Sequence, residues 1–204
     1  MRIIAGNAGG IPLQVPRSLT RPTTDRVREA IFSSLGDRVI GAVVLDLYAG
    51  TGALGLEALS RGAASATFVD HERQACDAVD ANRRKARLEG AEIICRPVRT
   101  FLKQRFGSRA NGTVAGSAGS EDADGHYDIV FADPPYARGS EAEVEIEALC
   151  AEPALREVLK PGGILVFESL FSAPPAFDEK AWVVARERRY GDTLVSFLNR
   201  NSDS

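Results

Sequence analysis

With 204 residues, of which 44% are hydrophobic and 26% charged, the chain is long enough for one soluble globular domain with a sizeable core. Its net charge of −3 excludes a protein that binds nucleic acid as a uniform polycation. No apolar run approaches the length of a membrane span and no leader pattern opens the chain, so we expect a cytoplasmic protein with no membrane contact.

Cysteine and histidine usage narrows the chemistry further. Cys76, Cys95 and Cys150 are odd in number and form no C-x-x-C pair, which indicates reduced thiols. His71 and His126 are isolated and have no ligand partners at metal spacing. We therefore predict no metal site.

The N-terminal region combines turn-rich and basic segments. Short apolar pieces alternate with glycine and proline over residues 1–20, which suggests an irregular β-hairpin appended to the main sheet. Apolar residues at four-residue spacing then predict a helix that begins near Thr24 or Asp25 and ends at Gly36. Residues 1–40 hold six arginines against three acidic residues, so this end of the chain is a candidate polyanion-binding face.

A glycine turn follows the first predicted buried strand, residues 42–47. Residues 48–55 read Y-A-G-T-G-A-L-G and lead into a predicted helix over 53–61. Strand, glycine loop and helix together are typical of a nucleotide-type site, where glycines let the backbone approach a ligand closely. The G-x-G-x-x-G match within this stretch is weak evidence alone.

Two acids near the glycine turn bear on the choice of cofactor. Asp70 ends the next predicted strand, residues 67–70, where it could take both ribose hydroxyls of an adenosine. NAD and S-adenosyl-L-methionine both fit this pattern. Asp46 lies before the turn, where it would repel a pyrophosphate but could receive a methionine ammonium, so it favours S-adenosyl-L-methionine. An NAD-dependent oxidoreductase is the alternative, and it is supported by the glycine pattern alone.

The middle of the chain is less informative. We predict an exposed helix over 72–89, a strand over 92–95 and a short helix over 98–106, with Val98 where an adenine ring would lie. Residues 107–126 are rich in Gly, Ala, Ser and Asp, which predicts a disordered surface insertion.

The stretch D-I-V-F-A-D-P-P-Y at residues 128–136 carries the clearest chemistry. Its apolar run suits a strand buried on both faces of a parallel sheet. Pro134 and Pro135 remove two backbone donors and fix two φ angles, so the chain after Asp133 is stiff and extended. A carboxylate at this end of a buried strand lies where open α/β sheets bind ligands.

This arrangement suits methylation of an exocyclic amine on a base. Asp133 can accept one N–H of the amine and the Pro134 carbonyl the other, which would point the nitrogen lone pair at an electrophilic methyl group. Tyr136 would stack on the base, a contact worth about 1–3 kcal/mol in comparable sites. An ordinary strand-end turn with a capping aspartate is the alternative.

The remaining pattern completes one domain, residues 1–204, with an extension at 1–38. Residues 138–140 are predicted to form a mobile lid, and an acidic helix that follows is interrupted at Pro153. A strand over 164–168 and an antiparallel hairpin, residues 182–189 with 193–199, would close the sheet.

Several motifs in this order resemble those of class I, S-adenosylmethionine-dependent amino-methyltransferases. They are D-L-Y-A-G-T-G at 46–52, the acid at Asp70 and D-P-P-Y at 133–136. The chain is similar in particular to the bacterial 16S rRNA guanine-N2 methyltransferases of the small ribosomal subunit. That similarity runs nearly end to end, apart from 107–126, and includes R-I-I-A-G at 2–6, R-P-T-T-D-R-V-R-E at 21–29 and L-D-L-Y-A-G-T-G-A-L-G-L-E-A-L-S-R-G-A at 45–63.

The resemblance implies a Rossmann-like α/β fold with a seven-stranded, mostly parallel sheet, an antiparallel last strand and a small N-terminal hairpin and helix. It implies S-adenosyl-L-methionine as cofactor, held by Asp46, Tyr48, Gly50, Thr51, Gly52, Asp70, Val98 and Asp133. It implies catalysis at Asp133, Pro134, Pro135 and Tyr136, and RNA contacts at Arg21, Thr23, Thr24, Arg26, Arg28, Tyr136 and Arg138. The expected partner is 16S rRNA within the small subunit or an assembly intermediate. The protein is expected to act as a monomer.

A different substrate keeps the same chemistry. D-P-P-Y alone is equally compatible with methylation of adenine N6 or cytosine N4 in DNA. The chain has little beyond the catalytic sheet with which to read a duplex sequence, which favours RNA.

Overall fold

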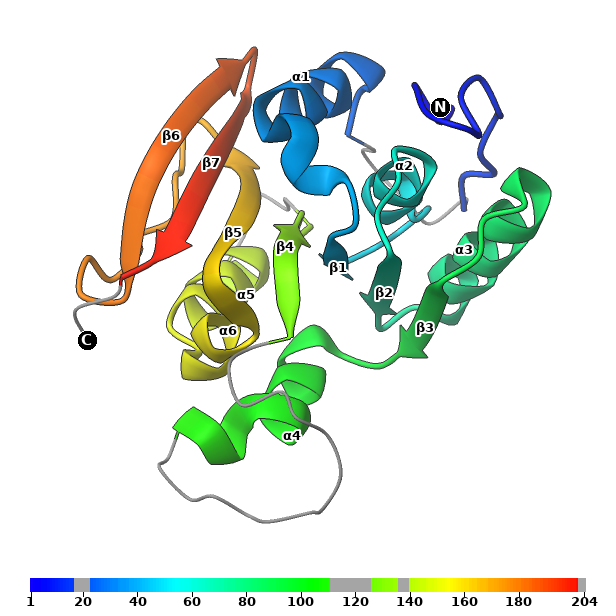
Figure 1. The fold of residues 1–204 in the computed structure, drawn as a ribbon. Coiled ribbons are helices and arrows are strands. Elements are labelled where there is room, and N and C mark those ends of the chain that lie inside the picture. Colours follow the sequence, from blue (N-terminus) through cyan, green and yellow to red (C-terminus); the bar gives the residue numbers. More distant parts are fainter. Residues whose placement is uncertain (17–22, 111–125, 136–139, 202–204) are drawn as a thin grey trace. The chain divides into compact units, whose positions relative to one another are not determined.

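The computed structural model describes residues 1–16, 23–110, 126–135 and 140–201, and the chain divides into two compact units, residues 1–97 and 98–204. The organisation of residues 1–204 as a single domain stays a prediction. Figure 1 shows the order of the elements along the chain.

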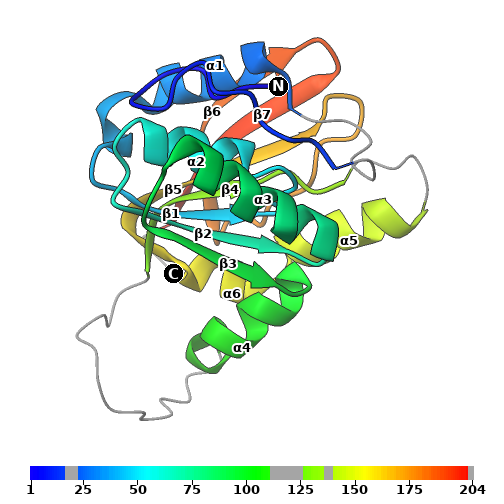
Figure 2. The same cartoon turned by 90° about the vertical axis from the view of Figure 1, so that its right-hand side faces the viewer.

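The first unit consists of a short parallel sheet with helices. Its elements are α1 (Asp25–Leu35), the 3-10 helix η1 (Gly36–Val39), β1 (Val43–Leu47), α2 (Ala53–Ser60), β2 (Ser65–Asp70), α3 (Arg73–Ala86) and β3 (Ala91–Cys95). The strands are parallel in the order β3-β2-β1, with Leu45 opposite Thr67 and Phe68 opposite Ile93. Helices α2 and α3 lie on the same side of these strands (Figure 2).

The sequence explains these elements locally. The side chain of Thr24 accepts the Val27 amide at 3.3 Å and caps α1, and Gly36 ends the helix with a φ of 55°. Strand β1 is buried on both faces, as expected for a parallel strand covered by helices. The predicted starts and ends of α1, β1, α2, β2 and β3 are confirmed within two residues.

The second unit carries the antiparallel end of the sheet. Its elements are α4 (Val98–Ala110), β4 (Tyr127–Ala132), α5 (Ser140–Cys150), α6 (Pro153–Glu157), β5 (Leu159–Leu170), β6 (Trp182–Tyr190) and β7 (Thr193–Arg200). Strand β4 pairs with β5 in parallel, and β7 runs antiparallel to both β5 and β6. The last strand is therefore antiparallel, and the seven strands are those of the predicted fold class.

Three predictions about local structure need correction. Helix α4 continues through Gly107 to Ala110, four residues into the segment predicted to be disordered, while residues 111–125 lie outside the described residues. Strand β5 begins at Leu159, so K-P-G-G at 160–163 lies within the strand rather than before it. Over its described residues 1–16, the N-terminal segment has an antiparallel bridge between Arg2 and Pro12, and hydrogen bonds at Ile4 and Pro12 join it to helices α2 and α3 rather than to a sheet edge.

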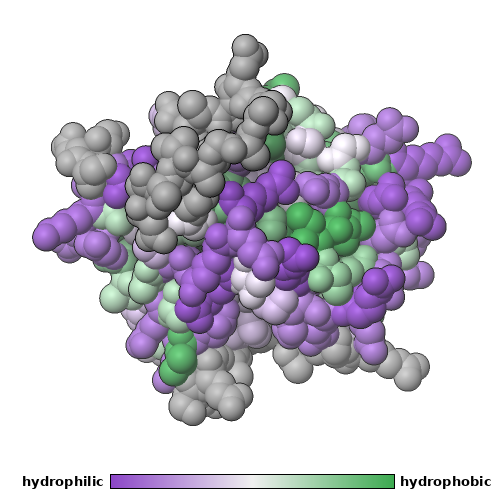
Figure 3. Space-filling view, turned by 90° about the horizontal axis from the view of Figure 1, so that it is seen from below, coloured by the Kyte–Doolittle hydropathy of each residue, from purple (hydrophilic) through white to green (hydrophobic). Residues whose placement is uncertain are grey.

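The surface is mostly polar. Among the residues coloured in Figure 3, hydrophilic ones predominate, and hydrophobic residues gather most densely to the right of the centre. Within the described ranges, no helix combines the length and apolar character needed to cross a bilayer.

Candidate active site

The turn after β1 has the backbone conformation that a close ligand approach requires. Tyr48, Gly50 and Gly52 have positive φ values of 59°, 53° and 76°. The Ala49 amide donates to the Val69 carbonyl at 3.2 Å, and the Gly52 amide donates to the Ala49 carbonyl at 2.7 Å. Because positive φ is strained for residues with a Cβ, the glycines make this tight turn accessible. These hydrogen bonds join the turn to β2 and lead it into the start of α2.

Asp70, at the end of β2, fixes this turn. One carboxylate oxygen accepts the Gly50 amide at 2.9 Å, and the other accepts the Glu72 amide at 2.9 Å. The residue is 9% exposed. Each carboxylate oxygen has two lone pairs, so Asp70 can hold the turn and still accept hydroxyl groups from a ligand.

Asp46, inside β1, is more deeply buried, at 2% exposure. Its Oδ2 accepts the Gly55 amide at 2.8 Å, which ties the strand to the first turn of α2. A Cβ added at Gly55 would lie 2.3 Å from Cε1 of Phe68 and 3.1 Å from Oδ2 of Asp46, so only glycine fits there. The third glycine of the motif therefore serves the packing of helix on strand.

Asn82, on α3, connects the turn to the N-terminal segment, and the sequence analysis did not identify it. It is fully buried, and its Nδ2 donates to the carbonyls of Thr51 and Gln14, both at 3.0 Å. Its Oδ1 accepts the Gln14 amide at 2.7 Å. The hydroxyl of Thr51 also contacts the sulfur of Met1 at 3.2 Å. The N-terminal segment thus lies against the glycine turn.

A second missed residue, Glu57 on α2, anchors the same segment. Its buried carboxylate accepts the amides of Ile4 at 2.6 Å and Ala5 at 3.0 Å, and it pairs with Arg61 at 2.6 Å. Ser60 adds to this anchor, because its hydroxyl accepts the Ala8 amide at 3.0 Å. The residue type alone does not indicate that a glutamate is buried. The one signal in the sequence is the pattern L-E-A-L-S, which places Glu57 within an otherwise apolar helix.

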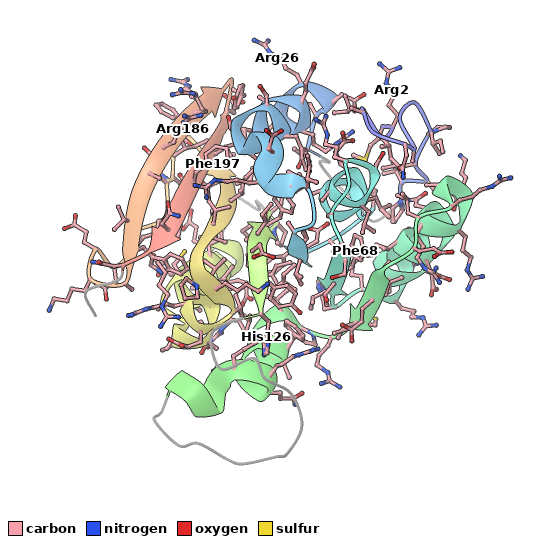
Figure 4. All side chains as sticks on the ribbon, in the orientation of Figure 1. Arg2, Arg26, Phe68, His126, Arg186 and Phe197 are labelled. Carbon is pink, nitrogen blue, oxygen red and sulfur yellow. The ribbon has the colours of Figure 1, made fainter. Side chains whose placement is uncertain are left out.

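The structure separates the basic residues of the N-terminal region. Arg26 is exposed and points away from the protein (Figure 4). Arg28 is fully buried, and its guanidinium donates to the carbonyls of Thr23 and Arg2 and to the carboxylate of Asp25. Arg28 therefore joins α1 to the N-terminal segment, and a contact from its side chain to RNA is not compatible with this position.

The other residues assigned to RNA differ in how they are placed. Thr23 is buried and Thr24 caps α1, so the hydroxyl of Thr24 is already used within the protein. Arg21, Tyr136 and Arg138 lie outside the residues that the structure describes.

In the second unit, the expected carboxylate lies directly after a buried strand. Residues 129–132 of β4 are buried, Asp133 is partly exposed, Pro134 is buried and Pro135 is exposed. Ala132 pairs with Phe167 of β5, so Glu168 and Ser169 of β5 lie level with Asp133 and Pro134. Both are buried, and the sequence analysis did not identify them. Val98 begins α4 and is buried.

The described residues include no candidate metal-binding group, and two of the cysteine thiols have raised pKa values. The described part of the chain holds no group of three His, Cys, Asp or Glu side chains that could bind a metal ion. Burial raises the pKa of the Cys76 thiol to about 12, and a hydrogen bond with Cys95 acts in the same direction. Burial also raises the pKa of Cys150 to about 12, with the charge of Glu147 adding to the effect. These two thiols stay protonated at neutral pH.

The fold is that of the class I methyltransferases. The solved structure described as putative methyltransferase yhhF from Escherichia coli is 30% identical, with a TM-score of 0.74 over 100% of this chain and 99% of that one. The putative methylase HI0767 from Haemophilus influenzae is 28% identical, with a TM-score of 0.69 over 98% and 97% of the two chains. The fold class predicted from the sequence is confirmed.

The chain belongs to the family described as Conserved hypothetical protein 95, whose model matches residues 1–199. Ribosomal RNA small subunit methyltransferase D of Escherichia coli (strain K12) is 39% identical over 140 residues, which are 68% of this chain and 62% of that protein. The chain thus spans less than two thirds of that relative. Putative rRNA methyltransferase YlbH of Bacillus subtilis (strain 168) is 32% identical over 98% of this chain and 99% of that protein. The family resemblance stated from the motifs is confirmed.

Proposed function

We propose that this protein transfers a methyl group from S-adenosyl-L-methionine to the exocyclic N2 amine of a guanine in 16S rRNA. The observation that carries the proposal is Asp133-Pro134-Pro135 placed directly after the buried parallel strand β4. The names of the relatives in Escherichia coli and Bacillus subtilis, which refer to rRNA methyltransferases, support the choice of substrate class.

The donor set of the first unit fits the proposed cofactor. When bound, S-adenosyl-L-methionine supplies an electrophilic methyl group on a positively charged sulfur. The remaining lone pairs of Asp70 would accept the ribose hydroxyls, and the buried carboxylate of Asp46 would neutralise the methionine ammonium. The backbone of Tyr48, Gly50, Thr51 and Gly52 would lie against the ligand, and Val98 would contact the adenine.

The chemistry assigned to the second unit is positioning. An exocyclic amine is a weak nucleophile because its lone pair is delocalised into the base. Asp133 would accept one of its hydrogens and the Pro134 carbonyl the other, while Pro135 keeps the backbone stiff. Asp133 would also face the methyl group, and Tyr136 would stack on the guanine, a contact worth about 1–3 kcal/mol.

The proposed partner is the small ribosomal subunit or an assembly intermediate. Arg21, Arg26 and Arg138 would contact phosphates while the loop guanine is splayed out, and Thr23 and Thr24 would place the start of α1 beside the RNA. We propose that the protein acts as a monomer in the cytoplasm, without a metal ion.

The proposal is tested by offering the enzyme methyl-tritiated S-adenosyl-L-methionine and small subunits from a strain that lacks the gene. Digestion of the RNA to nucleosides should place the label in N2-methylguanosine. Duplex DNA from the same strain is the parallel substrate. Label in N6-methyladenine or N4-methylcytosine of that DNA, with none in the RNA, would contradict the proposal. It would show instead that the protein is a DNA amino-methyltransferase.

A further inference from the structure

An exposed aromatic ring and an arginine lie together where β5 ends. Phe171 directly follows β5 and is 43% exposed, and the guanidinium carbon of Arg189 is 3.7 Å from the centre of its ring. The Nε of Arg189 donates to the Gly191 carbonyl at 2.9 Å, and the Phe171 amide donates to the Asp192 carbonyl at 2.8 Å. The β6–β7 turn therefore holds the side chain of Arg189 and the backbone of Phe171.

This pair lies at the same edge of the strands as the carboxylate after β4. Strands β4 and β5 are parallel, so Asp133 and Phe171 follow the carboxyl ends of neighbouring strands. Leu170 and Tyr190 are both register partners of Thr193, which brings the end of β6 to this edge as well.

Strand β6 continues the basic character away from the pair. Residues 183–189 are all exposed, and Arg186 and Arg188 lie among them. Because successive side chains alternate along a strand, Arg186 and Arg188 lie on the face of β6 opposite Arg189. Arg186 shares its face with its register partner Phe197 on β7, which is 3% exposed. The carboxylate of Glu187 accepts the Ser196 hydroxyl at 3.0 Å, so this acid is directed toward β7.

Protection of an edge strand explains only part of this pattern. Charged side chains on an edge discourage pairing with other chains, and any arginine on β6 could serve that purpose. The exposed Phe171 beneath Arg189 does not serve that purpose, because it adds apolar surface that favours contact with other molecules. A planar cation on an aromatic face is instead a surface on which a nucleobase can stack.

We propose that Phe171 and Arg189 form a second RNA-binding site, which holds a nucleotide that flanks the target guanine. The proposal rests on the proposed function, since it takes RNA as the substrate. The planar cation on an aromatic ring, at the same strand edge as Asp133, favours RNA over a ribosomal protein as the occupant. Stacking on the pair would hold the strand while the neighbouring base is presented to Asp133.

The test compares binding and turnover in the double variant Phe171→Ala/Arg189→Ala. Affinity for small subunits, measured by filter binding with S-adenosylhomocysteine present, should fall roughly tenfold, as expected for loss of one stacked base. The KM for small subunits should rise by a similar factor while kcat changes little. Arg189→Ala alone should lower the slope of log affinity against log salt by about one. Phe171→Trp keeps a stacking surface and should retain wild-type affinity.

The matched control is Arg105→Ala. Arg105 is exposed on α4, next to Phe106, whose ring packs on Tyr127 at the other end of β4. Unchanged affinity in the double variant would overturn the inference, as would an equal loss in Phe171→Trp. A loss on intact subunits that is absent on protein-free 16S rRNA would assign the surface to a ribosomal protein and also overturn it. Because binding needs no turnover, failure of methyl transfer by the wild type bears on the proposed function instead.

Discussion

Acidic residues end strands in both units, but the protein uses them differently. In the first unit, Asp46 and Asp70 are buried and accept backbone amides at 2.8–2.9 Å, so the glycine turn is built on them. In the second unit, Asp133 is partly exposed and precedes two prolines, which have no N–H to donate. The first arrangement holds its own backbone, whereas the second, under the proposed function, would hold a carboxylate toward a substrate.

This difference separates stability from turnover. Removing an acid of the first unit leaves buried amides without acceptors, a loss that costs about 1–3 kcal/mol for each group. Removing Asp133 takes away an acceptor that the proposed chemistry needs. Variants of the first region should therefore mainly lower the stability of the fold, whereas variants of Asp133 should mainly lower the rate of methyl transfer.

The largest effect is expected from Asp133→Ala. Methyl transfer to small subunits should fall about 10²- to 10³-fold, the range seen when one preorganised hydrogen-bonding group is lost. Calorimetry should show nearly unchanged S-adenosylhomocysteine affinity. The matched control is Asp128→Ala, at the other end of β4, where the aspartate pairs with Lys160 at 3.2 Å. Equal losses of transfer in both variants would remove the special role of Asp133.

Glu57→Gln should cause the largest loss of stability. The glutamine cannot provide acceptors for both Ile4 and Ala5, and the partly buried pair with Arg61 is broken. We expect the free energy of unfolding to fall by about 3 kcal/mol in urea titrations. Glu89→Gln, an exposed position, is the control and should be neutral. A neutral Glu57→Gln would mean that the N-terminal segment does not depend on this anchor.

Asp70→Asn should affect both properties. An asparagine has a single side-chain oxygen, so either Gly50 or Glu72 loses its acceptor. We expect a loss of about 1–3 kcal/mol in unfolding free energy, and a fall of about tenfold in S-adenosylhomocysteine affinity, equivalent to about 1.4 kcal/mol. Asp77→Asn, on the exposed face of α3, should change neither quantity. Weakened stability with intact affinity would leave Asp70 a purely structural role.

The smallest effect concerns the buried thiols. The pKa of Cys76 and of Cys150 is raised from 9.0 to about 12 by burial. Above pH 9 the unfolded chain loses these protons first, so the stabilising contribution is complete below pH 9 and is lost as the pH rises toward 12. Urea titrations should show lower stability at pH 10 than at pH 8, with a smaller difference in Cys150→Ala. An unchanged difference would show that other groups cause it.

The sequence predicted much of the fold because its signals are local. The glycine turn, the diproline and the C-terminal hairpin each depend on backbone rules that act over a few residues. Two predicted strands, residues 182–189 and 193–199, match β6 and β7 within one residue at either end. The same local character explains why Asp46 and Asp70 could be placed beside the turn.

The missed features depend on contacts between distant segments. The family resemblance implies an RNA contact at Arg28, but the acceptors of its guanidinium come from Arg2 and Thr23, far from it or before the helix in the chain. Asn82 and Glu57 bind backbone groups 68 and 52–53 residues away along the chain. No periodicity or motif indicates such pairs, and each of them ties the N-terminal segment to the rest of the first unit.

One measurement tests the central claim most directly: the single-turnover rate of methyl transfer to small subunits with S-adenosyl-L-methionine saturating, for Asp133→Asn and Asp70→Asn. Saturation removes the affinity defect, so Asp70→Asn should transfer at close to the wild-type rate while Asp133→Asn stays about 10²-fold slower or more. A wild-type rate in Asp133→Asn would contradict the assignment of the carboxylate after β4 to the reacting amine.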